Sequence, residues 1–496
     1  MNTSIRPGIA RRFAAAVGVV AIALFGTLAA AGPASAATGV GNITGTQGTL
    51  TIHKYERFGA NGVTPGNGQE QTVTGTPLNG VTFSIQRVAN YDLKTAAGWA
   101  SVQSIMAPAN PVTAATAAGL GAAASVTTTG SGTATATPPF GLYLVTETGT
   151  PSSVTEAAAP FLVSVPFATG PTATPSNTWI YDVHVYPKNA VTSLGKSETT
   201  TAADIAAGAD LARWAITAKV PVLASGTISS FVLTDVIDAA QLAFVTDAAA
   251  VALGLPAGTV TAVKADGTTA VAMTAGTDYT ISPATGTTRT VTFTSTGLTK
   301  LSTQAPGGTV TFDVLTRVVG VPANGVITNS ATSDVNGKSG NTATATTTFG
   351  QLQVFTHVTG TTTPLAGGVY RVKDAAGNTV VVNGVNSWTS DANGLLTVPE
   401  LRPGNYTLVL VTPPAGYQLP ANTQVATTIT AGTSDPAAPK NYVDVPYAQV
   451  PAWALPLTGG DGALWFGVGG VALVVIAAGA AVLVAARRRR HEAVQA

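Results

Sequence analysis

The feature of this sequence that most limits its fold is the recurrence of short runs rich in Val, Thr, Ile and Phe. Gly, Pro, Asn and Asp interrupt these runs about every 8–12 residues, the spacing expected when each run forms a strand and each interruption a turn. Runs that favour long helices are scarce. The pattern therefore predicts an all-β chain built of sandwiches, and its 496 residues are enough for about three domains.

The N-terminus has the composition of a secretory signal peptide. Arg6, Arg11 and Arg12 precede an apolar stretch from Phe13 to Ala31, and the small residues ASAA at 34–37 offer a cleavage site. We expect residues 1–36 to be removed on export. The sequence contains no cysteine. An exported chain of this kind has no disulfides, so its resistance to force and proteolysis must come from another source.

The C-terminus combines a short motif with an apolar span. LPLTGG at 455–460 is followed by an uncharged apolar run at 464–486 and a basic tail at 487–496. At about 1.5 Å per residue, the span reaches roughly 34 Å, which is long enough to cross a bilayer. The arginines at the start of the tail keep that end in the cytoplasm. Hydropathy alone would favour an ordinary single-pass anchor.

The motif in front of the span distinguishes it from a plain anchor. Together with the span and the basic tail, it resembles the cell-wall sorting signal of Gram-positive bacteria, whose pentapeptide here is Leu455, Pro456, Leu457, Thr458 and Gly459. The resemblance implies that a sortase cleaves between Thr458 and Gly459 and passes the Thr458 carboxyl group to an amine.

Two regions of the chain repeat the same order of motifs. GTLTIHKYE, PLNGVTF and GLYLVTETGTP in the first region correspond to GQLQVFTHV, PLAGGVY and GNYTLVLVTPPAGY in the second. This predicts related β-domains at 37–190 and 350–450, with a different domain at 191–349 and a C-terminal segment at 451–496. The low-complexity stretch at 124–139 is expected to be a loop. Residues 238–255 are the one stretch expected to hold a short helix or loop insertion.

The segment VHVYPKN at 183–189 gives the most specific resemblance. It is similar to the pilin motif of sortase-assembled major (backbone) pilins of Gram-positive bacteria, in which a lysine accepts the threonine acyl group of the next subunit. The resemblance implies three tandem Ig-like or prealbumin-like β-sandwich domains (CnaB-like, CnaA-like and CnaB-like), with Lys188 as acceptor and Thr458 as donor. By position alone, Lys188 is also compatible with a solvent lysine at a domain boundary.

The same resemblance implies the partners and the location of the chain. A pilin-specific (class C) sortase would join it to other copies of itself and to minor or tip pilins. A housekeeping sortase would attach the polymer to peptidoglycan, so the chain is expected in a wall-anchored pilus that supports adhesion. Its receptor is not specified. The formal net charge of +1 gives no sign of nucleic acid binding.

Members of this family also form intramolecular isopeptide bonds, in which a lysine attacks an asparagine side chain beside a carboxyl group. In the middle domain, the resemblance implies Lys196 and Asn329 as the cross-linked residues and Asp235 as the catalytic acid. The first domain offers a similar set in Lys54, Glu147 and Asn189, although the resemblance leaves open whether this domain is cross-linked. The site must be apolar so that the lysine is neutral and the acid protonated.

The third domain departs from this pattern. Alignment with the first domain places Thr356, Leu410 and Tyr447 at the positions of Lys54, Glu147 and Asn189. We therefore expect no isopeptide bond here, with Glu400 as the only nearby carboxylate that could change that expectation. The domain would then depend on ordinary packing, for which the core candidates are Leu352, Val354, Tyr370, Leu408 and Leu410.

Nothing in the sequence marks an enzyme. The histidines at 53, 184, 357 and 491 are scattered, and we find no metal-ligand spacing, G-x-S-x-G motif or phosphate-binding loop. No metal or cofactor is therefore expected. The alternative interpretations are a monomeric wall-anchored adhesin, which needs LPLTGG but not Lys188, then a tip pilin, and last a hydrolase.

Overall fold

A computed structural model describes residues 42–58, 66–170, 177–224, 226–256 and 258–451, together with the isolated positions 477 and 480. The expected signal peptide (1–36), the sorting motif with Thr458, the basic tail and all of the apolar span at 464–486 except positions 477 and 480 lie outside these residues. Among the described residues, no helix has the length and hydropathy needed to span a membrane. The chain divides into two compact units, 1–320 with 326–347 and 321–325 with 348–496.

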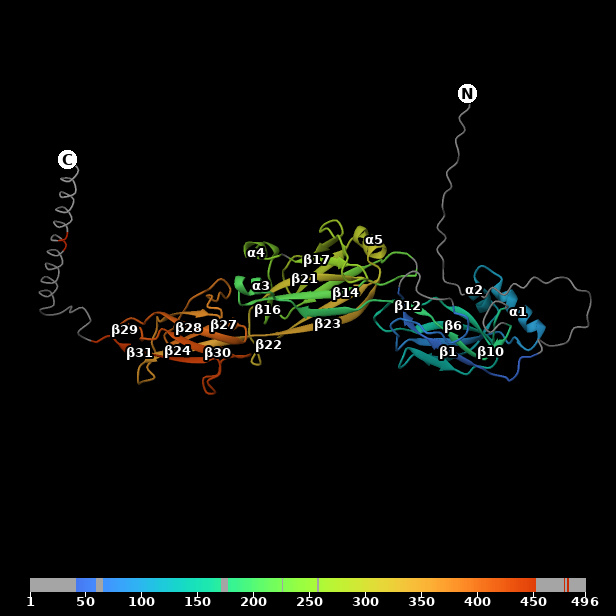
Figure 1. Cartoon of the computed structure of the whole chain (residues 1–496), viewed down its shortest axis with the longest axis horizontal. Helices are drawn as coiled ribbons and strands as arrows, with labels where there is room; N and C mark the ends of the chain where they lie inside the picture. Colours follow the sequence, from blue (N-terminus) through green and yellow to red (C-terminus); the bar gives the residue numbers. More distant parts are fainter. Residues whose placement is uncertain are drawn as a thin grey trace, which may run out of the picture. The chain divides into compact units, whose positions relative to one another are not determined.

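The described chain is built mainly of strands, as the interrupted β-branched runs predict (Figure 1). In the N-terminal domain, four sheets have the strand orders β11-β1-β5, β10-β9, β2-β12-β7 and β4-β3-β6-β8. The strands are β1 (Thr49–His53), β2 (Tyr55–Glu56), β3 (Thr82–Val88), β4 (Leu120–Thr127), β5 (Thr133–Ala136), β6 (Gly141–Gly149), β7 (Val154–Glu156), β8 (Phe161–Val165), β9 (Phe167–Ala168), β10 (Trp179–Ile180), β11 (Asp182–Val185) and β12 (Lys188–Val191).

Two helices that the sequence analysis did not predict cover part of this domain (Figure 1). They are α1 (Ala96–Met106) and α2 (Pro111–Ala117), capped by Thr95 and Asn110. Val102 and Ile105 of α1 join a buried apolar cluster with side chains of β3, β6 and β8. These helices are short and rich in Ala, Ser and Thr, so their apolar faces are too small to give a clear helical period in the sequence.

The expectation of a loop at 124–139 is wrong. The stretch contains the end of β4 and all of β5. β4 pairs with β3 from Thr127 to Leu120, yet its side chains are almost all exposed. Small residues that bury nothing show no apolar alternation, so backbone pairing alone defines this strand, and the sequence pattern could not reveal it.

The middle domain is a sandwich of two sheets, ordered β13-β14-β21-β17-β18, with β16 also paired to β21, and β19-β20-β15-β22-β23. Its strands and helices are β13 (Leu194–Glu198), α3 (Ala202–Ala207), β14 (Leu211–Lys219), β15 (Phe231–Val236), β16 (Leu242–Phe244), α4 (Asp247–Ala252), β17 (Thr259–Val263), β18 (Ala270–Val271), β19 (Tyr279–Ile281), β20 (Thr288–Phe293), α5 (Ser295–Gln304), β21 (Thr309–Val318), β22 (Val326–Val335) and β23 (Lys338–Thr348).

Inward-facing side chains of both sheets form the core of the middle domain. Ile216 and Phe312 come from the first sheet, and Phe231, Leu233 and Val291 from the second, and all five are at most 1% exposed. α4 lies in the stretch where a helix was expected, whereas α3 and α5 were not foreseen. α3 begins with a capping box, in which Thr201 and Asp204 satisfy each other's backbone N–H groups.

The C-terminal domain has two four-stranded sheets, ordered β27-β24-β31-β29 and β26-β25-β28-β30. The core candidates Leu352, Val354, Tyr370, Leu408 and Leu410 are all buried, as expected. The strands are β24 (Gly350–Val358), β25 (Val369–Lys373), β26 (Trp388–Thr389), β27 (Leu395–Leu401), β28 (Gly404–Thr412), β29 (Tyr417–Gln418), β30 (Gln424–Ile429) and β31 (Tyr442–Gln449).

Strand register shows that the first and third domains share one arrangement of paired strands, which we call the shared frame. Asn189 pairs with Glu56, two residues after Lys54, and Tyr447 pairs with Val358, two residues after Thr356. In both domains these pairings are parallel.

The position of the acid, Glu147 in the first domain and Leu410 in the third, follows the same strand arrangement. Glu147 pairs with Phe83, and Leu410 pairs with Tyr370. Phe83 and Tyr370 end the matching motifs PLNGVTF and PLAGGVY. The pairing thus places Thr356, Leu410 and Tyr447 where the first domain has Lys54, Glu147 and Asn189, as the sequence alignment predicts.

In the third domain, buried hydroxyl groups lie where the first domain has its candidate cross-link set. Thr356, Tyr370 and Tyr447 are each 0% exposed. The Thr356 Oγ1 and Tyr370 hydroxyl oxygens lie 2.7 Å apart in a hydrogen bond. Burial, and then the nearby Tyr370 hydroxyl, raise the pKa of Tyr447. None of the three side chains can act as an amine nucleophile or as a carboxylic acid, so the frame here is held by packing and neutral hydrogen bonding.

We predict that residues 350–450 carry no isopeptide bond and form the mechanically weakest domain. When the mature chain is stretched in a single-molecule experiment, this domain should unfold first and extend by its full contour, about 340 Å at roughly 3.4 Å per residue. Tyr370→Phe should destabilise it by about 1–2 kcal/mol, because the buried Thr356 hydroxyl loses its partner. A cross-linked peptide from this domain in a tryptic digest would contradict the prediction.

Candidate functional site

The middle domain brings together the three residues implied for its cross-link. Lys196 lies on β13 of one sheet, whereas Asp235 on β15 and Asn329 on β22 belong to the other. Lys196 Nζ is 3.1 Å from Asp235 Oδ1, and Asn329 Nδ2 donates to Asp235 Oδ2 at 3.3 Å. A bond between Lys196 and Asn329 would therefore tie the two sheets of the sandwich to each other.

Burial sets the protonation of this site. The side chains of Lys196 and Asp235 are 0% exposed, and Lys196 Nζ lies 5.6 Å from the centroid of the Trp214 ring. Burial lowers the pKa of Lys196 and raises that of Asp235, and in both cases this effect outweighs their mutual attraction. Burial thus shifts both groups toward the neutral amine and the protonated acid, the pair that amide formation requires.

The polar groups of the middle site are poorly satisfied before reaction. Lys196 Nζ, Asp235 Oδ1 and Asn329 Oδ1 have no aligned hydrogen-bond partner among the described residues. A buried polar atom without a partner costs about 1–3 kcal/mol. Conversion of the amine and the amide into one secondary amide would reduce the number of buried N–H donors that need a partner, whereas the two acceptor oxygens would remain.

The first domain assembles its candidate set more tightly. Lys54 Nζ donates both to Glu147 Oε1 and to Asn189 Oδ1, and Asn189 Nδ2 donates to Glu147 Oε2 at 2.8 Å. Lys54 and Asn189 are 0% exposed. Burial lowers the pKa of Lys54 to about 8, against the opposing attraction of Glu147. Nucleophile, acid and electrophile are all in mutual contact.

A backbone group that sequence reasoning missed completes the first site. The N–H of Ala158 donates to Asn189 Oδ1 at 2.6 Å. This oxygen would gain negative charge if a nucleophile attacked the amide carbon, so the N–H has the position of an oxyanion-hole donor. Every residue except proline carries such a donor, so no residue type could signal it. In the described middle domain, Asn329 Oδ1 has no equivalent donor.

Lys188 and Asn189 show why a lysine follows a proline at the end of a strand. Successive residues of β12 face opposite ways, so Asn189 points into the buried site while Lys188 is only half-buried. Burial, and then the nearby Arg57 guanidinium, lower the pKa of Lys188. In the part of the chain that the structure describes, no carboxylate forms an ion pair with its amine.

Two of the histidines that look scattered in the sequence lie together. His53 ends β1 and His184 is on β11, and the parallel pairing of these strands brings His53 Nε2 within 2.8 Å of His184 Nδ1. Glu70 completes a group whose ligand atoms all lie within 4.8 Å of one another. Spacing along the chain gives no sign of this grouping. Parallel strands join residues that are far apart in sequence.

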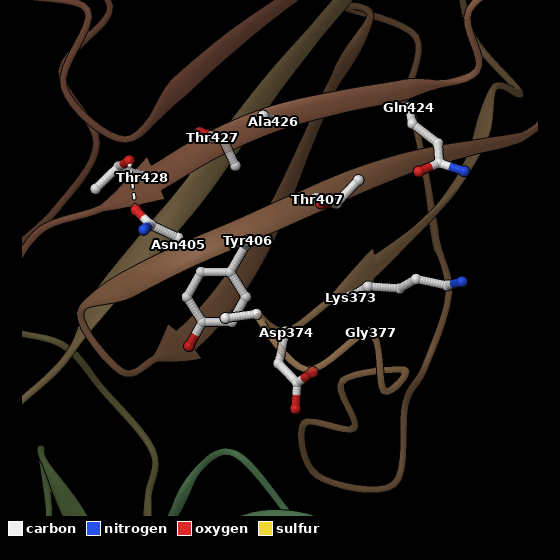
Figure 2. Close-up of a pocket in the computed structure, with 11 residues that line it drawn as sticks. Lys373, Asp374, Gly377, Asn405, Tyr406, Thr407, Gln424, Ala426, Thr427 and Thr428 are labelled. Carbon is white, nitrogen blue, oxygen red and sulfur yellow. Dashed lines mark hydrogen bonds between the residues drawn. The ribbon is translucent and has the colours of Figure 1, made fainter.

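A hollow of about 570 Å³ lies over β25, β28 and β30 of the third domain. Figure 2 shows its polar lining, which includes Lys373, Asp374, Tyr406 and Gln424. Asp374 Oδ1 already accepts from the backbone N–H groups of a turn, and Thr428 Oγ1 donates to Asn405 Oδ1 at 2.9 Å. None of the residues predicted for the cross-links or for polymerisation lines this hollow.

Comparisons with known proteins agree with this geometry. Residues 45–190 match the family described as "Gram-positive pilin subunit D1, N-terminal domain", and residues 350–438 match SpaA, described as "Prealbumin-like fold domain". The chain is 29% identical to the fimbrial subunit type 2 of Actinomyces naeslundii, over 94% of this chain and 95% of that protein. It is 32% identical to the fimbrial subunit type 1 of Actinomyces viscosus, over 35% of this chain and 31% of that protein.

A solved structure shows the same fold. The full-length major pilin SpaD from Corynebacterium diphtheriae is matched over 82% of this chain and 98% of that chain, with 23% identity and a TM-score of 0.57. The fold, the two matched family domains and the relative that is similar over nearly the whole length agree with one another. The chain therefore carries a domain of the Gram-positive pilin type at 45–190 and a prealbumin-like domain at 350–438, and over nearly its whole length it is similar to a fimbrial subunit.

Proposed function

We propose that this chain is a shaft subunit of a covalent pilus, in which Lys188 of one subunit is joined to Thr458 of the next. The observation that carries the proposal is that Lys188 and Asn189 are consecutive residues of β12 whose side chains point in opposite directions. One residue presents a partly exposed amine with a lowered pKa, and its neighbour anchors the same strand in a buried reactive site. An acceptor amine must be reachable, readily deprotonated and fixed in position, and the partial exposure, lowered pKa and strand position of Lys188 support this role.

The polymerisation step is an acyl transfer. A pilin-specific sortase cleaves the Thr458–Gly459 peptide bond and holds the Thr458 acyl group. The neutral amine of Lys188 attacks this carbonyl, releases the enzyme and loses one proton, which leaves an amide between two subunits. The same chemistry with a peptidoglycan amine, catalysed by a housekeeping sortase, would attach the pilus to the cell wall after the C-terminal segment has held the precursor at the membrane.

The internal cross-links form without an external enzyme. The lone pair of Lys196 Nζ attacks Cγ of Asn329, and the electrons of the C=O bond move to Oδ1. The protonated Asp235 gives its proton to Nδ2, which it contacts, and takes one proton from the attacking nitrogen. The carbonyl bond then reforms, the C–Nδ2 bond breaks and ammonia leaves. Lys54, Glu147 and Asn189 perform the same sequence in the first domain. Each reaction happens once per molecule, so the chain is a structural protein and not an enzyme in turnover.

The cross-links would close long loops. Lys54 and Asn189 are 135 residues apart, and Lys196 and Asn329 enclose a loop of 133 residues. By the loop-entropy model, each closure stabilises its domain by roughly 5 kcal/mol. In a chain without cysteine, these bonds would take the place of disulfides and carry tension from one terminal strand to another without unfolding the domain.

The polymerisation hypothesis predicts the behaviour of cell-wall extracts. Wild-type cells should give a ladder of high-mass species on a denaturing gel after boiling, because amide links survive. Lys188→Ala should abolish the ladder and leave wall-linked monomer, whereas Thr458→Ala should remove both. Lys338→Ala, at an exposed lysine on β23, is the matched control and should leave the ladder intact. A single band from wild-type cells would favour a monomeric adhesin.

The cross-link hypothesis predicts the mass of the intact mature protein. Two ammonia molecules should be missing relative to the sequence mass. Glu147→Ala and Asp235→Ala should each restore one, because an unassisted amide is a poor electrophile. Asp313→Ala is the control, since burial raises the pKa of this carboxyl too, yet it is not part of either site. A deficit that persists in Asp235→Ala would show that a different acid acts in the middle domain.

The Ala158 N–H predicts a kinetic effect that is restricted to the first domain. Ala158→Pro removes this donor, and loss of one oxyanion donor slows comparable reactions by about 10²–10³-fold. Freshly purified variant should therefore lack one ammonia instead of two, and the second should be lost slowly on incubation. Ala159→Pro, which keeps the Ala158 N–H, should mature like the wild type. Equal maturation of both variants would show that the donor does not assist the reaction.

A further inference from the structure

We propose that His53, Glu70 and His184 form a binding site for a divalent transition metal of the Zn²⁺ type in the first domain. The proposal does not rest on polymerisation or on cross-linking. His53 Nε2 and His184 Nδ1 face each other at 2.8 Å, and all three ligand atoms lie within 4.8 Å of one another. Two imidazole nitrogens and one carboxylate oxygen are a ligand set that Zn²⁺ accepts, with a fourth position left for water.

The second nitrogen of His184 is held as in known metal sites. His184 Nε2 lies 3.3 Å from Asp182 Oδ2. A histidine that ligates a metal usually donates its other ring N–H to a carboxylate, which fixes the ring and leaves the ligating nitrogen with its lone pair. Asp182 thus orients His184 Nδ1 toward His53. Together with Glu70, it also supplies two negative charges to balance a divalent cation.

The protein positions the remaining ligands through ordinary contacts. The His53 ring stacks on Tyr186, with centroids 4.8 Å apart and an interplanar angle of 11°. The Tyr186 hydroxyl accepts from the backbone N–H of Gln71 at 2.6 Å, and the backbone N–H of His184 donates to Gly68 O at 2.9 Å. The segment that carries Glu70 is therefore attached on both sides of Glu70 to the strand that carries His184.

Occupation by a metal requires only small movements. Two nitrogens bound to Zn²⁺ at about 2.0–2.1 Å in tetrahedral geometry are about 3.3 Å apart, so the two rings must separate by about 0.5 Å. Glu70 is exposed, and its side chain can swing toward the rings. The proton between the rings moves to His53 Nδ1, so both histidines stay neutral and each offers one lone pair.

The third domain shows that the shared frame does not require these histidines. In the register that aligns Lys54 with Thr356, His53 corresponds to Phe355. His184 pairs with Thr51, and its counterpart Tyr442 pairs with Gln353, so the same frame carries Tyr in place of His184. Aromatic residues thus satisfy the packing at both positions, and the histidine pair adds a chemical capacity that the fold does not need.

The site lies next to the proposed acceptor lysine. Tyr186, which stacks on His53, is two residues before Lys188, and Lys54 directly follows His53, the last residue of β1. A bound metal would attach the Glu70 segment to β1 and β11 and stabilise the strand that presents Lys188. We therefore expect metal binding to slow amide hydrogen exchange most clearly at residues 68–71.

The test uses the untagged mature chain, stripped with a chelator and titrated with Zn²⁺ against a chromophoric competitor. We expect one Zn²⁺ per chain, with signals of the His53 and His184 rings shifted in NMR spectra and slower amide exchange at residues 68–71. Glu70→Gln, in an exposed position, should weaken binding by about 10–100-fold, and His184→Ala should abolish it. Ca²⁺, which prefers oxygen ligands, should not compete.

His357 provides the matched control. It also faces a carboxylate, with Nε2 3.0 Å from Asp444 Oδ1, but its Nδ1 lies 2.6 Å from the Thr361 carbonyl oxygen and no second histidine is near it among the described residues. His357→Ala should bind Zn²⁺ like the wild type. Equal affinity in wild type and His184→Ala, or no stoichiometric binding at all, would overturn the proposal and leave the two rings as a structural hydrogen bond.

Discussion

Much of this structure depends on the cost of placing a lysine amine in an apolar interior. Desolvation is the largest influence on Lys54 and Lys196, and it lowers the pKa of both although a carboxyl group lies beside each. Water would protonate these amines and make them unreactive. The packing that stabilises each domain therefore also shifts its buried lysine toward the neutral, nucleophilic form, as the proposed cross-links require.

The alternation of side chains along a strand links internal cross-linking to assembly. On β12, consecutive residues face opposite ways, so an asparagine directed into the buried site leaves the preceding lysine directed outward. An isopeptide bond at Asn189 would hold this strand in register with β2 and β7. Tension applied through the Lys188 amide of a polymer would pass to Asn189, the next residue, and through its bond to Lys54 into β1. The hydrogen bonds at the edge of the sheet would not have to break first.

The sequence predicts much of this because order along the chain carries the information. The family resemblance, applied to a lysine near the start of each domain, an acid in between and an asparagine near the end, implies both candidate sets, and the structure brings the members of each set together. The features that were missed lack such a signal. Strand β4 buries almost nothing, helices α1 and α2 have small apolar faces, and the Ala158 donor is a backbone group. The pairing of His53 with His184 depends on parallel strands 131 residues apart, a relation that no local pattern records.

The third domain serves as an internal comparison for both reactive features of the first. It keeps the same parallel register, yet carries Thr356, Leu410 and Tyr447 in place of the cross-linking set, and Phe355 and Tyr442 in place of the histidines. A glutamic acid left without its lysine would be costly at this depth, which explains why all three members differ together. The frame is therefore stable through packing alone, and the buried lysine and the paired histidines are additions to it that must be explained by what they bind or react with.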